Sequence, residues 1–325
     1  MASIDRVPLG STGLMVPPIA VGCAEIGSMP EAFAYAVSED DALATIRAAL
    51  DSPLNYIDTA ALYGDGESER RVGLVLRERG GLPAGAILET KAGRDPRDNN
   101  YRRETVQRRF ERSLELLGVD KVHACFLHDA EWAPFAELTA PGGVVELLLD
   151  YKRQGVIGAL GVAAGPVDLS MQYVQTGLFD LLITHNRYSL LNRTANTVQI
   201  EAKRRGMGVL NAAPYGSGML AKGPDAYPRY AYMTAPAAMI ETTRVIADIC
   251  ARYDVPLAAA ALQFSMLDPN VDVTIVGMSK AERIPQTIAL ATAEIPQALW
   301  DELSGLPTFD TDPEAGRFSD LAPTS

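Results

Sequence analysis

Short apolar runs alternate with longer amphipathic stretches along most of the chain. Eight apolar runs predict β-strands, at residues 19–22, 56–58, 87–91, 122–128, 157–162, 181–184, 209–211 and 273–276. Eight amphipathic stretches predict helices, at 40–50, 67–77, 103–117, 144–153, 168–175, 194–205, 237–253 and 280–291. Three of these helices are followed by a glycine, which favours a left-handed C-cap, at Gly118, Gly155 and Gly206.

Strands that alternate with helices pair in parallel through right-handed crossovers. A unit of about 40 residues is typical of a single-domain α/β fold, the (β/α)8 TIM barrel. The alternative is a doubly wound sheet, which binds a dinucleotide through Gly-x-Gly-x-x-Gly after its first strand. Residues 22–27 read Gly-Cys-Ala-Glu-Ile-Gly and do not fit, so no Rossmann domain is expected. We expect the barrel to span 1–306, followed by a tail, 307–325, that is surface-draped or partly disordered.

Composition narrows the partners of this barrel. The 325 residues carry a net charge of −12, which disfavours nucleic acid and anionic membranes and leaves a small-molecule substrate. The longest uncharged stretches, such as 255–267, fall short of the ~20 residues of a membrane span. Three distant cysteines, Cys23, Cys125 and Cys250, match neither a disulfide framework nor a metal site. A cytoplasmic location is expected, and the oligomeric state stays open.

Ionisable residues follow three neighbouring predicted strands, where barrels place their chemistry. Asp58 ends one strand and is followed by Tyr63, while Lys91 and His128 end the next two. A lysine cation lowers the pKa of a nearby tyrosine, and a carboxylate holds that lysine in place. A neutral histidine can orient a substrate oxygen. These groups would form a proton relay for a carbonyl/alcohol pair, with Tyr63 as general acid/base and a nicotinamide cofactor carrying the hydride.

Each of these residues also has an ordinary structural interpretation. Asp58 could cap a helix or a turn, and Lys91 could be solvated. His128 could be a core histidine paired with Asp129. It is much less expected that all of these interpretations hold together at successive strand ends than that any single one holds.

The run Tyr-Ile-Asp-Thr-Ala-Ala-Leu-Tyr-Gly-Asp-Gly-Glu-Ser-Glu at 56–69 resembles the aldo-keto reductase signature D-T-A-x-x-Y-G-x-G-x-S-E. The strand ends Glu-Thr-Lys at 89–91 and Phe-Leu-His at 126–128, and the run 277–283, resemble further motifs of that family in the same order. The resemblance covers roughly 7–306. It implies a (β/α)8 barrel that binds NAD(P) without a Rossmann domain and a tetrad of Asp58, Tyr63, Lys91 and His128.

Two departures from the common pattern of that family indicate which subgroup the chain resembles. Many members have Gly-Val-Ser-Asn after the fifth strand, and the Ser-Asn pair holds the nicotinamide amide. Here Ala163 and Ala164 stand in its place. Many members also stack an aromatic ring on the nicotinamide, where this chain has Ala212. These departures, with the runs 187–191 and 213–220, resemble a subgroup that oxidises L-fucose, L-galactose or D-threo-aldoses, or the hemiacetal of pyridoxal, to a lactone.

The resemblance therefore implies an NAD(P)-dependent oxidoreductase acting on the anomeric hydroxyl of a free aldose or on a cyclic hemiacetal. One alternative is an NADPH-dependent aldehyde or ketone reductase with the same tetrad. Another is a regulatory barrel that binds nicotinamide nucleotides as a sensor. NAD is favoured slightly over NADP because Gly277-Met278 replaces a Lys-Ser pair of NADP-preferring members. Lys280 could partly compensate or could be solvated.

The cofactor residues implied by the resemblance lie on the loops after several strands: Gly22, Asn186, Pro214, Tyr215, Ser217, Gly218, Leu220, Gly277, Met278, Ser279, Arg283, Gln286 and Thr287. The substrate candidates are Glu25, Ile26 and Trp132, with Tyr227, Tyr230 and Tyr232 as weaker ones that could instead pack the loops together. The proline-containing segment 223–236 predicts a semi-rigid lid rather than a helix.

Overall fold

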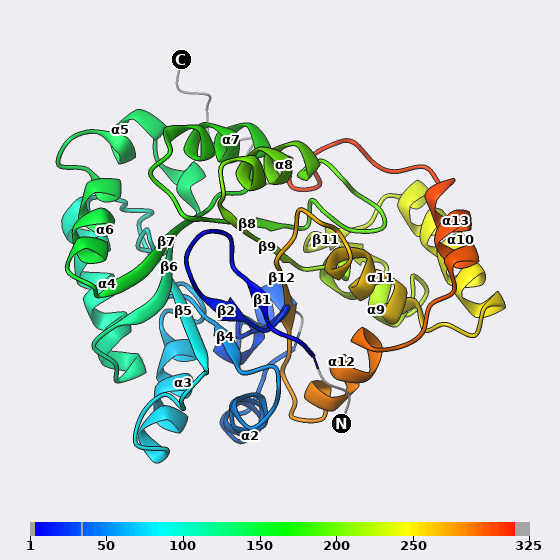
Figure 1. Ribbon diagram of the computed structural model, residues 1–325, viewed down its shortest axis with the longest axis horizontal. Helices are drawn as coiled ribbons and strands as arrows, with labels where there is room; N and C mark the ends of the chain where they lie inside the picture. The colour runs from blue at the N-terminus through cyan, green and yellow to red at the C-terminus, as the bar shows by residue number, and fades with distance from the viewer. Residues whose placement is uncertain (1–3, 34, 316–325) are drawn as a thin grey trace.

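Eight parallel strands close into a barrel, which confirms the predicted (β/α)8 fold (Figure 1). The computed structural model describes residues 4–33 and 35–315. The strands pair around the barrel in the order β12-β3-β4-β5-β6-β7-β8-β9. Their bounds are β3 Ile19–Gly22, β4 Tyr56–Asp58, β5 Ile87–Gly93, β6 Val122–His128, β7 Ile157–Ala163, β8 Leu181–His185, β9 Gly208–Ala212 and β12 Val273–Gly277.

The longer helices surround the strands (Figure 1). The eight predicted helices are present, with ends that differ from the predicted ones by at most three residues. They are α2 Glu39–Leu50, α3 Glu67–Glu78, α4 Arg103–Leu117, α6 Val144–Arg153, α7 Val167–Thr176, α8 Asn196–Arg204, α10 Ala237–Arg252 and α12 Arg283–Ala291. The short helices are α1 Pro30–Phe33, α5 Phe135–Thr139 and α9 Met219–Lys222, with 3-10 turns η1 Glu25–Gly27, η2 Ala130–Trp132 and η3 Gly216–Gly218.

Three elements do not follow from the pattern of apolar and polar positions. Helix α11, Leu257–Met266, is apolar over most of its surface because it is largely buried, so it lacks an amphipathic period. Helix α13, Gln297–Ser304, has only two buried residues, Leu299 and Leu303. The hairpin of β1, Val7–Pro8, and β2, Met15–Val16, lies over the centre of the barrel (Figure 1). Its Leu9 and Val16 are fully buried in the cluster that fills the barrel interior.

The inward side chains of the strands decide what lines the barrel mouth. Successive strand residues alternate between the two faces, and residues such as Ala20, Phe126, Ile183 and Ile275 fill the interior. Two positions beyond this interior layer lies a further inward layer, near the carboxyl ends of the strands where barrel enzymes place their chemistry. This mouth layer consists of Gly22, Asp58, Lys91, His128, Ala163, His185, Ala212 and Gly277.

The first part of the C-terminal segment packs against the barrel instead of draping over its surface. The backbone N–H of Phe309 donates to the carbonyl of Leu191, and Asn192 Nδ2 donates to the carbonyl of Thr311 at 2.9 Å. Glu314 is fully buried. Two acidic residues of this segment, Asp312 and Glu314, pair with a buried arginine that is described below. Residues 316–325 lie outside the described part of the chain.

The segment 223–236 contains no helix, as its prolines predict. It forms a hairpin of two short strands, β10 Arg229–Tyr230 and β11 Met233–Thr234. The ring of Tyr232 meets the ring of Phe33 edge-on at 6.3 Å between centroids. This hairpin therefore contacts the end of helix α1.

Gly73 allows helices α3 and α4 to approach each other closely. A Cβ at this position would lie 1.9 Å from the carbonyl oxygen of Leu116 on α4. Alanine has the better helix propensity, by about 1 kcal/mol, but the backbone clash outweighs it. We expect Gly73→Ala to destabilise the protein by about 3 kcal/mol, measured by chemical denaturation. Wild-type stability in this variant would contradict the helix contact.

Candidate active site

Lys91 and Asp58 form a buried ion pair at the mouth. Their side chains are 3% and 4% exposed, and the Lys91 ammonium donates a hydrogen bond to the Asp58 carboxylate. Lys91 Nζ also donates to the carbonyl of Thr59 and lies 3.0 Å from the Tyr63 hydroxyl. Burial is the largest single influence and lowers the pKa of Lys91, but the charge and hydrogen bond of Asp58, together with Tyr63 and Glu89, outweigh it and raise the pKa. The lysine is therefore a fixed cation directed at the tyrosine.

A tight turn after β4 presents Tyr63 to this cation. The backbone N–H of Tyr63 donates to the carbonyl of Ala60, and the N–H of Ser68 donates to the carbonyl of Tyr63. Gly64 follows with φ of 62°, and a Cβ there would lie 2.2 Å from the carbonyl oxygen of Gly27. Only glycine fits this close approach. The Gly64 in the signature run thus explains how the turn can place the phenol beside Lys91.

The sequence predicts that Lys91 lowers the pKa of Tyr63, but the pKa of the folded site is raised overall. Burial raises the pKa of the phenol above its usual value, and the Lys91 cation lowers it by less. The expectation that the lysine acts to lower the pKa holds for that interaction. Desolvation outweighs it because the phenolate would be buried. The tyrosine is thus protonated at neutral pH in the free site.

His128 lies across from Tyr63, with the two rings edge-on and their centroids 5.8 Å apart. Burial lowers the pKa of His128 to about 4, although the Asp129 carboxylate 3.6 Å away opposes the shift. The imidazole is therefore neutral, as the relay requires. Its Nδ1 is buried and has no hydrogen-bond partner within the described residues. The contact with Asp129 is present, but it does not satisfy the ring as a purely structural histidine would be satisfied.

The lowered pKa of His128 makes stability depend on pH. In the unfolded chain a histidine binds a proton below about pH 6.5, whereas folded His128 does so only near pH 4. Folding stability must therefore fall as pH falls between these two values. We expect wild type to lose about 2 kcal/mol more than His128→Gln between pH 7 and pH 4.5, measured by urea denaturation. Parallel losses in the two proteins would contradict a neutral, buried His128.

A second carboxyl group lies beneath the Asp58–Lys91 pair. Glu89 is fully buried and points inward two residues before Lys91, and it accepts a hydrogen bond from the Tyr56 hydroxyl. Burial, followed by the charge of Asp58, raises its pKa well above the usual value. This environment favours the protonated form of Glu89 beside the charged pair. The period of two along β5 would have placed it there from the sequence alone.

Four residues of the mouth layer have a small side chain or none. They are Gly22, Gly277, Ala212 and Ala163, on β3, β12, β9 and β7. A Cβ at Gly277 would lie 2.1 Å from Glu25 Oε1, and a Cβ at Gly22 would lie 3.1 Å from Ile275 Cγ2. The Glu25 carboxylate thus occupies the space beside Gly277, which leaves no room there for a side chain.

Six further predicted cofactor residues lie in two groups, one after β12 and one after β9. Ser279, Arg283 and Gln286 are accessible beyond β12, and Arg283 Nη1 donates to Gln286 Oε1 at 3.3 Å. Tyr215, Ser217 and Gly218 follow β9 and are half-buried, with Ser217 in the left-handed region at φ 61°. Arg283 is thus an accessible cation of the kind a nucleotide phosphate requires.

Other predicted residues pack inside the protein and do not face the mouth. Ile26, Leu220 and Met278 are at most 1% exposed and belong to the apolar core clusters. Thr287 is buried, and its Oγ1 lies 3.9 Å from the sulfur of Met278. Pro214 is buried as well. Their motif positions follow the family pattern, but strand ends and helix faces turn these side chains into the core.

Two substrate candidates remain near the mouth. Glu25 Oε2 is buried without a hydrogen-bond partner among the described residues, and burial raises the pKa of this carboxyl to about 7. Trp132 stacks under the Arg94 guanidinium at 4.2 Å, and its buried Nε1 likewise has no partner in that part of the chain. Buried polar atoms of this kind suit a ligand with hydroxyl groups.

The three tyrosines of the segment 223–236 have different surroundings. Tyr230 is buried and donates to the carbonyl of Asn186, so it packs the loops together. The ammonium of Lys222 lies 4.4 Å from the ring centroid of Tyr227. Tyr232 lies close enough to Tyr63 to raise the pKa of that phenol slightly. Of the three, Tyr232 is therefore the one that approaches the tetrad.

The residues present fit a nicotinamide dinucleotide. Arg283 offers an accessible cation for the nucleotide phosphates. Asn186 is fully buried at φ 58°, and neither polar atom of its amide has a hydrogen-bond partner within the described residues. An unpaired buried amide is costly unless a ligand satisfies it. Within residues 4–33 and 35–315, no group of three or more His, Cys, Asp or Glu could hold a metal ion.

Comparisons with known proteins agree with this geometry. The sequence model of the Aldo/keto reductase family matches residues 18–306. A D-threo-aldose 1-dehydrogenase from a Pseudomonas species is 31% identical, covering 90% of this chain and 95% of its own. A pyridoxal 4-dehydrogenase from Microbacterium luteolum is 30% identical, covering 92% and 96%. An L-galactose dehydrogenase from Arabidopsis thaliana is 27% identical, covering 90% and 89%.

The fold comparison extends over nearly the whole chain. The holo form of an aldo-keto reductase from Bacillus halodurans superposes with a TM-score of 0.74 at 19% identity. The match covers 97% of this chain and all of that structure. Within the described residues no helix is long and apolar enough to cross a membrane.

Proposed function

We propose, from the premise that the chain belongs to the aldo/keto reductase family, that it is an NAD(P)+-dependent dehydrogenase of sugars. It oxidises the anomeric hydroxyl of a free aldose, or the hydroxyl of a cyclic hemiacetal, to a lactone. The observation that carries the proposal is the 3.0 Å contact between the buried Lys91 ammonium and the Tyr63 hydroxyl. Once Tyr63 is a phenolate, it can receive a hydroxyl proton while the Lys91 cation stabilises its negative charge.

The chemistry follows from the charge states of the tetrad. A nicotinamide dinucleotide, when bound, supplies the hydride acceptor. Tyr63 as phenolate takes the hydroxyl proton of the substrate, and Lys91 stabilises that phenolate through its fixed charge. Asp58 keeps Lys91 in place. Neutral His128 hydrogen-bonds the substrate oxygen as the carbonyl forms. The proton then leaves from Tyr63 to water, which completes the turnover.

The substrate class rests on the relatives and on the polar atoms at the mouth. Three relatives at 27–31% identity are named as dehydrogenases of a D-threo-aldose, pyridoxal and L-galactose. The unpaired Glu25 Oε2 and Trp132 Nε1 could bind the hydroxyls of such a substrate. The positions Ala163 and Ala212 match the subgroup that acts on sugars and hemiacetals. We favour NAD+ over NADP+ because Gly277 and Met278 supply no cation beside Arg283.

The proposal is tested by the near-ultraviolet absorbance of reduced nicotinamide at alkaline pH. Purified protein is mixed with NAD+ or NADP+ and with L-fucose, L-galactose, D-arabinose, D-glucose or pyridoxal. Reduction of NAD+ by one of these compounds is the expected result. The control is the same mixture with Tyr63→Phe. Absence of reduction with all five substrates would contradict the proposal.

A reductase is the second candidate. One relative, from Escherichia coli, is named as an NADH-specific methylglyoxal reductase and is 24% identical over 91% of this chain. The same tetrad serves that direction, since a protonated Tyr63 can donate a proton to a carbonyl. Oxidation of NADH or NADPH by simple aldehydes, without any sugar oxidation, would favour this candidate.

A further inference from the structure

His185 completes the mouth layer on the side away from Asp58 and Lys91. It is the last residue of β8 and pairs in register with Ala212 on β9. On β7, the mouth layer holds Ala163, in register with His128. The imidazole of His185 is 26% exposed. Among the mouth-layer residues of β7, β8 and β9 it is the one polar side chain, and its neighbours in that layer are Ala163 and Ala212.

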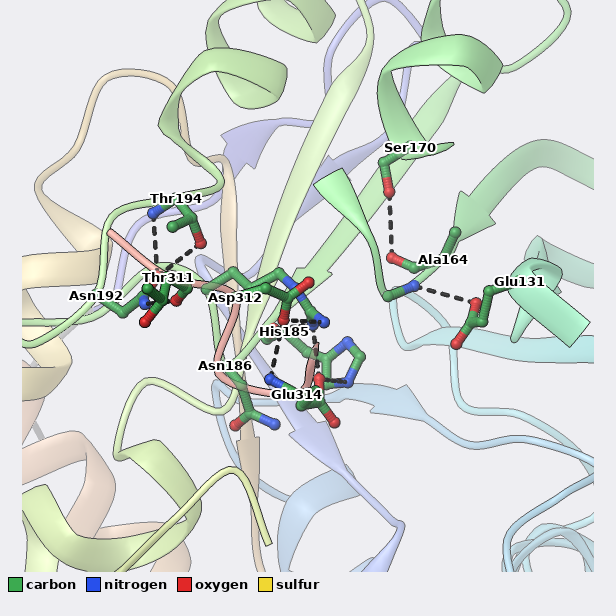
Figure 2. A network of polar contacts seen from close by, with 12 residues as sticks. Glu131, Ala164, Ser170, His185, Asn186, Asn192, Thr194, Thr311, Asp312 and Glu314 are labelled. Carbon is green, nitrogen blue, oxygen red and sulfur yellow. Dashed lines mark hydrogen bonds and ion pairs between the residues drawn. The ribbon is translucent and has the colours of Figure 1, made fainter. Parts of the chain in front are cut away.

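Glu314 holds this imidazole from the C-terminal segment (Figure 2). Its Oε2 lies 3.0 Å from His185 Nε2 and 2.6 Å from Arg187 Nη1. The other guanidinium nitrogen, Arg187 Nη2, lies 2.7 Å from Asp312. The side chains of Arg187 and Glu314 are each 1% exposed. A buried ion pair of this kind keeps Glu314 in one place, because separating the charges would leave both without compensation.

The contact with Glu314 fixes which nitrogen carries the proton when the imidazole is neutral. A carboxylate only accepts hydrogen bonds, so the imidazole proton belongs on Nε2. Nδ1 is then an acceptor, and no hydrogen bond within the described residues reaches it. His185 therefore presents a defined acceptor at the mouth rather than a ring that rotates between two forms.

The next residue, Asn186, offers complementary groups. Its amide is fully buried, and neither Nδ2 nor Oδ1 has a partner in the described part of the chain. A carboxamide ligand needs an acceptor for its N–H groups and a donor for its oxygen. The pair of residues at the end of β8 can supply both.

We propose that Glu314 is a positioning residue for the nicotinamide end of the cofactor. It fixes His185 so that Nδ1 and the Asn186 amide hold the carboxamide of the ring, where Ala163 and Ala164 offer no side-chain hydrogen bond. This inference rests on the proposed function. It makes the C-terminal segment a part of the cofactor site, although this segment lies more than a hundred residues along the chain from β8.

The test compares two nucleotides that differ only at the nicotinamide end. Dissociation constants are measured by calorimetry for the oxidised dinucleotide that wild type binds more tightly and for its ringless counterpart, ADP-ribose or 2′-phospho-ADP-ribose. We expect His185→Ala to weaken the dinucleotide about tenfold and Glu314→Gln about threefold, the range of one or two lost hydrogen bonds. Both variants should bind the ringless nucleotide within about twofold of wild type. That binding also shows that they are folded.

Asp312→Asn is the matched control. It keeps an oxygen that can accept from Arg187 and from the N–H of Glu314, and it does not touch His185. We expect this variant to bind both nucleotides as wild type does. A loss that is equal for the dinucleotide and the ringless nucleotide would overturn the proposal, because Glu314 would then serve only the fold. Unchanged nucleotide binding with a raised KM for the sugar would overturn it too. Wild-type protein that binds neither nucleotide would overturn the proposed function as well.

Discussion

Replacement of Tyr63 with phenylalanine is expected to lower kcat for sugar oxidation about a thousandfold, the typical size of a general acid/base contribution. The substitution removes only the hydroxyl that lies 3.0 Å from Lys91 Nζ. The ring stays, so its edge-on packing against His128 is preserved. Initial rates by absorbance give kcat, and calorimetry gives the nucleotide affinity. The affinity should stay within about threefold of wild type, because the phenol receives the proton of the substrate.

The matched control for this variant is Tyr227→Phe. Tyr227 lies on the segment 223–236, and its ring contacts the Lys222 ammonium, whereas the Tyr63 ring contacts Lys91. We expect this control to keep kcat within about twofold of wild type. Turnover by Tyr63→Phe near the wild-type rate would show that another group transfers the proton.

Removal of the Lys91 cation is expected to slow oxidation about a hundredfold or more at neutral pH. It should also shift the pH–rate profile to higher pH. Burial already raises the pKa of Tyr63, and the lysine charge is the main interaction that lowers it. In Lys91→Met the phenolate loses that support. Oxidation needs the phenolate, so its rate rises with pH in both proteins and should rise at higher pH in the variant. The measurement is kcat against pH in wild type and in the variant.

Lys91→Met alone would leave the Asp58 carboxylate buried without its partner, which costs several kcal/mol. The double variant Asp58→Asn with Lys91→Met removes both charges and keeps the site neutral. It distinguishes a loss of stability from a loss of catalysis. The double variant should recover stability, while its pH–rate profile should stay shifted to higher pH. A double variant with the wild-type profile would contradict the coupling between Lys91 and Tyr63.

The regular part of the fold could be predicted from the sequence because apolar residues recur with one period in each helix or strand. Strands β3, β4 and β6 and helices α4 and α6 have the predicted bounds, since apolar and polar positions change at both of their ends. The buried helix α11 could not be predicted because it has no polar face to mark a period. The packing of the C-terminal segment was missed for a different reason. Its acidic residues pair with Arg187, and no local pattern reports a contact over such a distance.

The chemistry at the mouth was predictable where strands end in ionisable residues. Asp58, Lys91 and His128 meet Tyr63 because parallel strands of one barrel bring their carboxyl ends together. His185 was missed because the predicted strand ended one residue before it. The motif positions Ile26 and Leu220 show the limit of a linear pattern, since it does not say which way a side chain turns.

The direct test of the central claim follows the anomeric hydrogen. The aldose that reduces the cofactor in the absorbance test is prepared with deuterium on its anomeric carbon, and the products are analysed by mass spectrometry and NMR. The account predicts that the deuterium appears in the reduced nicotinamide and that the sugar product is the lactone. Deuterium that stays in the sugar, or a product oxidised at another carbon, would contradict oxidation of the anomeric hydroxyl.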